Sequence, residues 1–268
     1  MQYQRVAFGF LRKLFVILLV CVPAFAFAQE VEFGEDELIG NGMKGGIVED
    51  VDDEDEQVFP FYGSLDIASK NIWRGIGNGD APLVYPTVGF SKGRWDVFVW
   101  GAFAVDDSYK ELNFSVSYSF SNFRIELVDY FFPERDSDFF NFSNRSTTHS
   151  AEAIVYYEPV AFPIHVIVGT TIYGDDKNEK GNNAFSSYGE VGYTHEFNEK
   201  NIAEAAVGFS LNKSYYTDYE KGFSPVNLTA AYTRVFTLWN YDLPVSARYA
   251  YNPYLEKSYF ALSLSFGF

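Results

Sequence analysis

The chain alternates large apolar and small polar residues over much of its length. The clearest case is the segment 112–120, in which every even-numbered residue is large and apolar and every odd-numbered residue from Asn113 is small and polar. The last residues, 260–268, repeat the pattern. A period of two is typical of a β-strand whose two faces meet different surroundings.

The same alternation recurs from residue 61 onwards. It predicts an all-β fold, a transmembrane antiparallel β-barrel of about twelve strands. The expected spans are 62–74, 82–91, 95–105, 109–120, 123–132, 148–158, 163–173, 185–197, 202–212, 224–236, 242–252 and 257–268. An even number of strands is usual in single-chain bacterial barrels.

The connections between the expected strands alternate in length. Those after even-numbered strands are short, as at 121–122 and 198–201. Several of those after odd-numbered strands are longer, at 133–147, 174–184 and 213–223. Short periplasmic turns and longer extracellular loops are typical of outer-membrane barrels. The alternation therefore places both ends of the barrel on the periplasmic side.

The first residues have the three parts of a secretory signal peptide. A basic region that includes Arg12 precedes an apolar run, 14–22, which is too short to span a bilayer. Ala26 and Ala28 have the spacing of a cleavage site. We expect residues 1–28 to direct export across the inner membrane.

Cysteine usage excludes several kinds of site. The chain has 1 Cys, Cys21, which lies inside the expected signal peptide. The exported protein then has no disulfide, no thiol nucleophile and no cysteine-based metal site. We expect neither a bound metal nor a cofactor.

Acidic residues dominate the segment 29–58, where only Lys44 opposes them. Few apolar residues and high like charge predict a disordered periplasmic extension, so the barrel is expected to occupy residues 59–268. The run Asp50–Glu56 supplies carboxylates for a divalent cation, but it lacks a turn-forming ligand loop, which favours a solvated tail. The net charge of the chain is −16, which argues against nucleic acid as a partner.

Aromatic residues are too numerous for a single soluble core. The chain has 28 Phe, 20 Tyr and 4 Trp. A soluble sandwich hides only some of these side chains, whereas a membrane barrel turns many of them to lipid. Together with export, this predicts the bacterial outer membrane as the location, with the lipid bilayer and lipopolysaccharide around the barrel.

The face opposite the apolar one lines the interior of such a barrel. Continuing the alternation along each strand predicts these pore-lining residues: Asp66, Lys70, Arg74, Asp96, Arg124, Glu126, Glu152, Glu190, Glu204 and Arg248. They form either a charged lumen that selects solutes or a set of inter-strand ion pairs that close a narrow barrel. Arg124 and Glu126, two residues apart on one face, are spaced to pair with each other.

Asp129, His195 and Arg234 fall instead on the outward face. His195 and Arg234 lie near expected strand ends, from which a long side chain can reach the polar interface. Charges are costly on the lipid-facing side. Asp129 therefore requires a β-bulge near 130–133 to be consistent with the barrel.

The segment 66–75, Asp-Ile-Ala-Ser-Lys-Asn-Ile-Trp-Arg-Gly, resembles the opening of the TorF-type porin family. Members of that family begin with a strand that ends in an aromatic-Arg-Gly triplet. A polar loop, a strand, a glycine-containing turn and a tryptophan-rich strand follow, and here they correspond to 76–82, 84–90, 92–94 and 95–100. The match covers the first three strands. The rest of the barrel resembles the family only in its general pattern of residues.

The resemblance implies a porin-like channel for passive diffusion of small hydrophilic solutes or ions. It also implies that the barrel-assembly machinery recognises the C-terminal strand through Phe260, Phe266 and Phe268. The predicted interior has more acids than bases, which favours cations weakly.

An outer-membrane enzyme is an alternative class. A serine nucleophile needs an activating histidine beside it, but His149 and Ser150 are adjacent and point to opposite faces of a strand. His165 and His195 have no serine two residues away. A rim protease would use carboxylates such as Asp138 with His149, but loop acids are usually solvated. We expect no enzymatic activity.

A non-conducting structural or adhesive barrel is the other alternative. The long loop 133–147 carries Phe139, Phe140 and Phe142. Aromatic residues on a loop are often functional. This loop would either fold into the lumen as a constriction, bind an outside partner or pack on the rim of the barrel.

Overall fold

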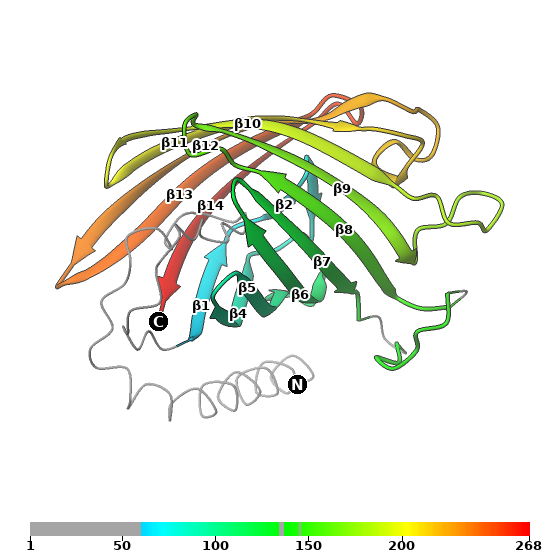
Figure 1. Cartoon of the computed structure of the whole chain (residues 1–268), viewed down its shortest axis with the longest axis horizontal. Helices are drawn as coiled ribbons and strands as arrows, with labels where there is room; N and C mark the ends of the chain where they lie inside the picture. Colours follow the sequence, from blue (N-terminus) through cyan, green and yellow to red (C-terminus); the bar gives the residue numbers. More distant parts are fainter. Residues whose placement is uncertain (1–59, 134–136, 145) are drawn as a thin grey trace, which may run out of the picture. The chain divides into compact units, whose positions relative to one another are not determined.

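A computed structural model describes residues 60–133, 137–144 and 146–268. The predicted signal peptide, 1–28, and the acidic segment, 29–58, lie outside the described residues. Twelve antiparallel strands form a closed barrel (Figure 1), which confirms the predicted fold class. The barrel strands are β1 (Phe61–Ala68), β4 (Leu83–Lys92), β5 (Trp95–Ala104), β6 (Lys110–Phe120), β7 (Phe123–Phe131), β8 (His149–Tyr157), β9 (Ile164–Gly174), β10 (Ser187–Asn198), β11 (Asn201–Ser210), β12 (Ser224–Leu238), β13 (Tyr241–Asn252) and β14 (Lys257–Gly267).

The first and last strands close the ring. Strand β1 pairs with β14 on one side and with β4 on the other, so that Ser64 lies opposite Gly267 and also opposite Thr87. All other neighbours in the barrel follow the order of the sequence. This order leaves no free sheet edge in the barrel, as a membrane requires.

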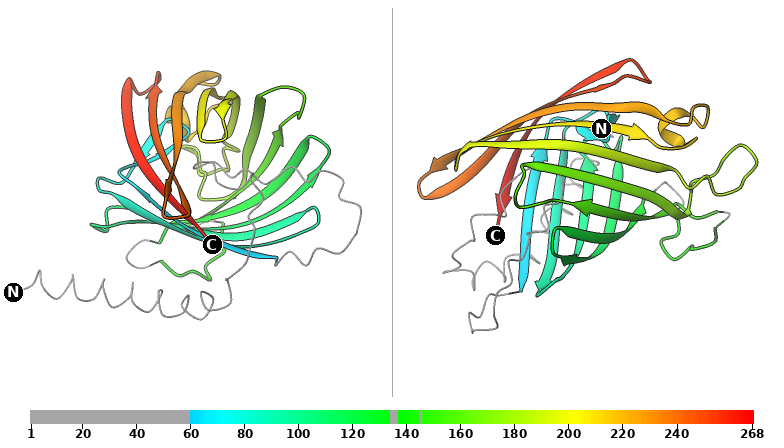
Figure 2. Two further views of the ribbon diagram at one scale, coloured as in Figure 1. Left: turned by 90° about the vertical axis from the view of Figure 1, so that its left-hand side faces the viewer. Right: turned by 45° about the horizontal axis from the view of Figure 1, so that its top comes forward.

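Loop length differs between the two ends of the barrel. The start of β1 and the end of β14 share one end of the barrel with tight turns, for example at 121–122 and 239–240. The longer connections 132–148, 175–186 and 211–223 lie together at the opposite end (Figures 1 and 2). The predicted alternation of short and long connections is confirmed.

The two faces of the barrel wall have opposite chemistry. Along β6 the inward residues are polar and buried, from Glu111 through Asn113 to Ser117, whereas the outward residues are apolar and partly exposed. Exposed apolar side chains cover the outside of the other strands as well: they include Leu65, Ile67, Val97, Val99, Ile125, Leu127, Val155, Val168, Val191, Val207, Leu228, Phe260 and Leu262. A closed barrel that is apolar outside and polar inside is a transmembrane barrel.

The predicted first strand, 62–74, is wrong at its C-terminal end. Strand β1 stops at Ala68, and the chain then forms a separate hairpin of β2 (Asn71–Trp73) and β3 (Ile76–Asn78). The two short strands pair with each other and with no barrel strand. The alternation is lost at Ser69-Lys70-Asn71, three polar residues in succession, so the sequence did mark a position where the barrel strand could end.

The hairpin β2–β3 packs against the inner wall of the barrel. A Cβ added to Gly75 would lie 2.1 Å from the carbonyl oxygen of Val226, and one added to Gly77 would lie 2.4 Å from the ring of Tyr259. The side-chain amide of Asn252 donates to the carbonyl oxygen of Gly75 at 3.2 Å. Gly75 therefore permits close approach to the backbone of β12, and Gly77 leaves room for the ring of Tyr259 on β14.

Helical structure in the described residues is confined to a single short turn. This is the 3-10 helix η1 (Tyr215–Thr217), in the loop between β11 and β12. Within the same residues, no helix has the length and apolar character needed to cross a membrane.

Candidate functional site in the barrel interior

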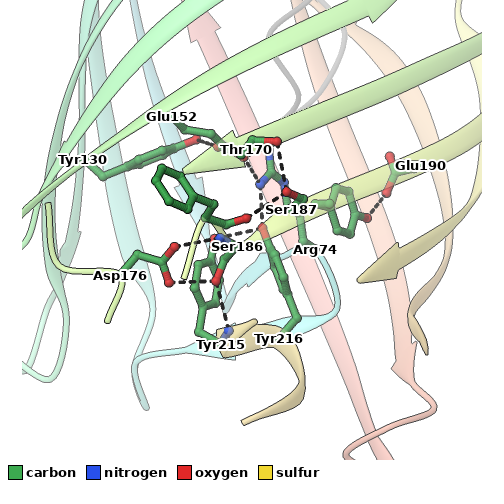
Figure 3. A network of polar contacts seen from close by, with 12 residues as sticks. Arg74, Tyr130, Glu152, Thr170, Asp176, Ser186, Ser187, Glu190, Tyr215 and Tyr216 are labelled. Carbon is green, nitrogen blue, oxygen red and sulfur yellow. Dashed lines mark hydrogen bonds and ion pairs between the residues drawn. The ribbon is translucent and has the colours of Figure 1, made fainter. Parts of the chain in front are cut away.

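Arg74, at the tip of the inward hairpin, joins three separate parts of the molecule (Figure 3). Its Nη1 donates to Oε1 of Glu152 on β8 at 2.7 Å and to the hydroxyl of Tyr216 in η1 at 2.6 Å. The guanidinium carbon lies 4.7 Å from the ring centroids of Trp73 and of Tyr188. Arg74 is therefore held by a buried ion pair, a hydrogen bond and two aromatic faces.

The wall beneath this ion pair needs a glycine. A Cβ at Gly169 on β9 would lie 2.3 Å from Oε1 of Glu152 and 3.2 Å from Nη2 of Arg74. Any larger residue would push Glu152 away from Arg74. Gly169 thus sets the position of the carboxylate without contributing a polar group.

Tyrosine side chains surround the Arg74–Glu152 pair. The hydroxyl of Tyr130 donates to Oε2 of Glu152 at 2.8 Å, and the hydroxyls of Tyr215 and Tyr216 are 2.9 Å apart. Burial raises the pKa of Tyr215 to about 12, and burial also raises the pKa of Tyr216 well above its ordinary value. These η1 phenols therefore stay neutral and act as hydrogen-bond partners near physiological pH.

Arg124 and Glu126 form a second buried ion pair, as predicted from their spacing. Arg124 Nη1 lies 2.8 Å from Glu126 Oε2, with 4% and 0% of the two side chains exposed. The guanidinium carbon lies 3.6 Å from the ring centroid of Tyr156, and the hydroxyl of Ser115 donates to Glu126. The positive charge of Arg124 and the negative charge of Glu126 therefore compensate each other within the barrel wall.

Glu190 on β10 is the centre of a third polar group. It accepts hydrogen bonds from the hydroxyl of Tyr188 and, at 3.0 Å, from the amide of Asn227. Nε2 of His165 lies 3.6 Å from Glu190 Oε1. A Cβ at Gly192 would lie 2.1 Å from the His165 ring, so this glycine lets the imidazole lie flat on the wall.

Four further residues of the predicted set also face the interior. Asp66 accepts a hydrogen bond from the hydroxyl of Ser265. Both carboxylate oxygens of Asp96 lie 3.1 Å from the hydroxyl of Tyr62. Glu204 on β11 and Arg248 on β13 both lie directly opposite Ala231 of β12. The two charged residues are therefore at the same level of the sheet, with one strand between them.

Lys70 is not a strand residue and does not line the wall, contrary to its place in the predicted set. It lies between β1 and β2, where its Nζ donates to the carbonyl oxygen of Gly79 and lies 4.0 Å from Asp80. Because β1 ends at Ala68, the inward alternation no longer applies at this position. Lys70 instead connects the two ends of the inward hairpin.

Sequence reasoning missed several interior residues. Glu111 on β6 is only 6% exposed and accepts a hydrogen bond from the hydroxyl of Tyr109. Alternation alone places Glu111 on the face of Asn113, so the pattern contained this signal. No period-two signal marks Tyr216, which reaches the interior from a loop.

The outward positions of His195 and Arg234 are as predicted. His195 contacts the ring of Phe197 with centroids 4.5 Å apart, and the Arg234 guanidinium lies 5.3 Å from the ring of Phe236. Both residues lie towards the end of the barrel with the tight turns, the end that carries the β12–β13 turn. At this level a charged side chain can reach the polar interface.

The expectation of a β-bulge at Asp129 is wrong. The register runs without a break from Phe114 through Asp129 to Ala151, which leaves Asp129 on the outward face. There its Oδ2 lies 2.8 Å from Nδ1 of His149. An ion-pairing partner on the same face, rather than a change of face, accommodates this carboxylate.

The described segment 137–144 of the loop between β7 and β8 packs on the outside of the wall. The ring of Phe139 lies 5.7 Å from Phe114 and 5.1 Å from Phe131, and both of these residues are on the outward face. This packing contradicts the alternative in which the loop folds into the lumen as a constriction. The inward hairpin β2–β3 occupies the interior instead.

The observed contacts of the three histidines do not include a serine hydroxyl. The ring nitrogens of His149 contact Asp129 and the carbonyl oxygen of Phe139, His165 contacts Glu190, and His195 packs on aromatic rings. In the part of the chain that the structure describes, no group of three or more His, Cys, Asp or Glu residues is arranged to hold a metal ion.

No family model matches the chain, and no curated protein does. Among solved structures, the chain is similar to the COG4313 outer membrane channel from Pseudomonas putida F1, with 11% identity, 82% of this chain and 98% of that chain covered, and a TM-score of 0.42. It is also similar to a Pseudomonas aeruginosa FadL homologue (10% identity, 79% and 90% covered, TM-score 0.38) and to the translocator domain of the autotransporter NalP from Neisseria meningitidis (13% identity, 80% and 90% covered, TM-score 0.35). The resemblance to the TorF-type porin family stays a prediction, and the fold of the chain rests on its own strand pairing.

Proposed function

We propose that this protein is a channel of the bacterial outer membrane through which small hydrophilic solutes or ions diffuse passively. The observation that carries the proposal is the hairpin β2–β3, which enters a polar interior and is fixed there by Arg74 and Glu152. A barrel of this size lies between the packed eight-stranded and the open sixteen-stranded barrels. An inward segment in such a barrel restricts the path to small solutes.

The interior charges support a weak preference for cations. Arg74 and Arg124 are each committed to a glutamate, which neutralises Glu152 and Glu126. The acids Asp66, Asp96, Glu111, Glu190 and Glu204 also face the interior, where the further strand base is Arg248. An excess of carboxylates along a narrow path raises the local concentration of cations.

The outer surface and the C-terminal strand indicate the partners that we propose for the barrel. The outward apolar face fits a bilayer with lipopolysaccharide in its outer leaflet. The C-terminal strand, with Phe260, Phe266 and Phe268, is proposed as the segment that the barrel-assembly machinery recognises. We propose no enzymatic role; the ring nitrogens of His149 contact Asp129 and the carbonyl oxygen of Phe139, and neither contact is with a nucleophilic hydroxyl.

A structural or adhesive barrel without conductance is the second candidate. The packing of Trp73 against Tyr130, Tyr215 and Tyr216 favours it. These rings join the hairpin to the wall and to η1, and they fill part of the interior. The two candidates differ in one measurable property, the passage of ions.

Planar-bilayer recording of the refolded protein separates the two candidates. We expect small, uniform conductance steps from the wild type. A variant in which residues 71–78 are replaced by a short Gly-Ser linker should give larger steps, because the restricting segment is absent. Arg234→Ala, which removes an outward arginine, is the control and should leave the steps unchanged. Absence of conductance in both the wild type and the linker variant would overturn the channel and favour the structural barrel.

A further inference from the structure

His149 is buried on the outward face of the barrel. It shares this face with Phe131, its partner across the β7–β8 ladder, yet only 1% of it is exposed. The segment 137–144 covers it: the rings of Phe139 and Phe142 lie 5.4 Å and 4.7 Å from the imidazole. A polar ring on the outside of a membrane barrel is thus shielded by a loop of its own chain.

Both ring nitrogens of His149 face acceptors. Nε2 lies 2.9 Å from the carbonyl oxygen of Phe139, and Nδ1 lies 2.8 Å from Oδ2 of Asp129. A carbonyl oxygen only accepts, so Nε2 must carry a hydrogen. The contact with Asp129 then needs a second proton, either on Nδ1 or on the carboxyl group. In both cases the covered pair holds one proton more than a neutral imidazole beside a carboxylate.

Among the described residues, the other titratable groups near the segment make contacts that need no added proton. The hydroxyl of Tyr173 donates to the carbonyl oxygen of Phe142, and Lys177 Nζ donates to Asn144 Oδ1 at 2.7 Å. Asp138 Oδ1 accepts from the backbone N–H of Phe140 at 3.0 Å, and the backbone N–H of Asp175 donates to the carbonyl oxygen of His149 at 2.8 Å. The hydrogen bonds that require an added proton are those of Asp129 and His149.

We propose that segment 137–144 is a proton-dependent strap on the outer wall of the barrel. It is docked while Asp129 and His149 share the extra proton, and it is released as the pH rises and that proton is lost. Docking takes up one proton, so the docking equilibrium weakens by at most about tenfold per pH unit. The docked strap leaves Phe140 79% exposed and Phe142 51% exposed on the outside of the barrel, so the pH controls whether this aromatic surface is presented.

A spin label on the strap tests the proposal. In the Cys21→Ser background, Ser143→Cys provides a single labelling position on an exposed residue of the strap. The labelled barrel is refolded into phosphatidylcholine vesicles, and label mobility is followed between roughly pH 5 and pH 8, where histidine ordinarily changes its charge. We expect mobility to increase with pH in this background.

Two variants and one control make the outcome decisive. His149→Gln keeps an amide donor for Phe139 but cannot take up a proton, and Asp129→Asn removes the carboxylate; in both, the pH dependence should disappear. His195→Gln changes an outward histidine far from the strap along the chain and should keep the original curve. Heat-modifiability on gels reports whether each variant is folded, and Asp129→Asn serves if His149→Gln does not fold. A flat curve in the labelled parent, or an unchanged curve in folded His149→Gln or Asp129→Asn, overturns the proposal.

Discussion

Arg74 and Glu152 are 78 residues apart in the chain, yet Arg74 Nη1 lies 2.7 Å from Glu152 Oε1. The contact joins the inward hairpin to strand β8, and the two side chains are 11% and 2% exposed. Removing one member of such a pair leaves the other charge buried without compensation. The pair is therefore one of the contacts that hold the hairpin in place, together with the hydrogen bond from Asn252 to Gly75.

Arg74→Ala should destabilise the folded barrel by about 3–5 kcal/mol, the range for breaking one side of a buried ion pair. The free energy of unfolding in urea, measured with the barrel in lipid vesicles, checks this value. Adding Glu152→Gln to Arg74→Ala should recover part of the loss, because the uncompensated charge is removed. Arg234→Ala, at an outward arginine, should change stability by no more than about 0.5 kcal/mol. Equal effects of Arg74→Ala and Arg234→Ala would contradict the prediction.

Gly192→Ala should destabilise the barrel by about 1–3 kcal/mol, the usual effect of overpacking. The added methyl group would lie 2.1 Å from the His165 ring and would displace it from Glu190. Gly222→Ala is the matched control, because a Cβ there meets nothing within 4 Å. Urea unfolding of both variants tests the comparison. A Gly192→Ala protein as stable as Gly222→Ala would show that the wall has room to adjust.

Phe268→Asp should lower the amount of barrel in the outer membrane several-fold, because the proposed assembly segment ends at this residue. Quantitative immunoblots of outer-membrane fractions measure the effect. Phe162→Asp is the control: Phe162 is 65% exposed and lies in the turn between β8 and β9. Normal abundance of the Phe268→Asp protein would remove this residue from the proposed signal.

Glu204→Lys should shift ion selectivity towards anions. It reverses a charge on the interior row that also holds Arg248. The reversal potential across a salt gradient measures the shift, which should shrink as ionic strength rises, since screening acts over about 10 Å at 0.1 M salt. Glu199→Lys makes the same change in the β10–β11 turn and should have a smaller effect. Anion preference in the wild type would refute the charge argument itself.

Strand positions were predictable because the membrane imposes one rule on every strand. A residue such as Val116 must face lipid and Ser117 must face the interior, so period two marks the barrel strands. Register shifts interrupt it only locally, for example between Gly208 and Phe209. The predicted first strand was wrong where it was carried past the polar run Ser69–Asn71 into a hairpin that pairs only with itself. Alternation describes the backbone of a strand and does not identify the partner of that strand.

In the interior site, the contacts that could be predicted were those between residues on one barrel strand. The pairing of Arg124 with Glu126 follows from two residues on one strand. The contact of Arg74 with Tyr216 depends on a hairpin and a loop that meet in three dimensions. The pairing of Asp129 with His149 was missed for a related reason, since the covering Phe139 comes from a loop whose direction no periodicity describes.

The inward hairpin is attached to the barrel at both of its ends. It leaves β1 after Ala68 and returns to β4 at Leu83, and these two strands are direct neighbours in the sheet. The hairpin is therefore an internal loop on a short double tether, unlike a separate plug domain that could leave the barrel as a whole. Any wider state of the path must keep the hairpin next to the β1–β4 seam. Solutes would then pass along the opposite side of the interior, so an enlarged pore should be eccentric in cross-section.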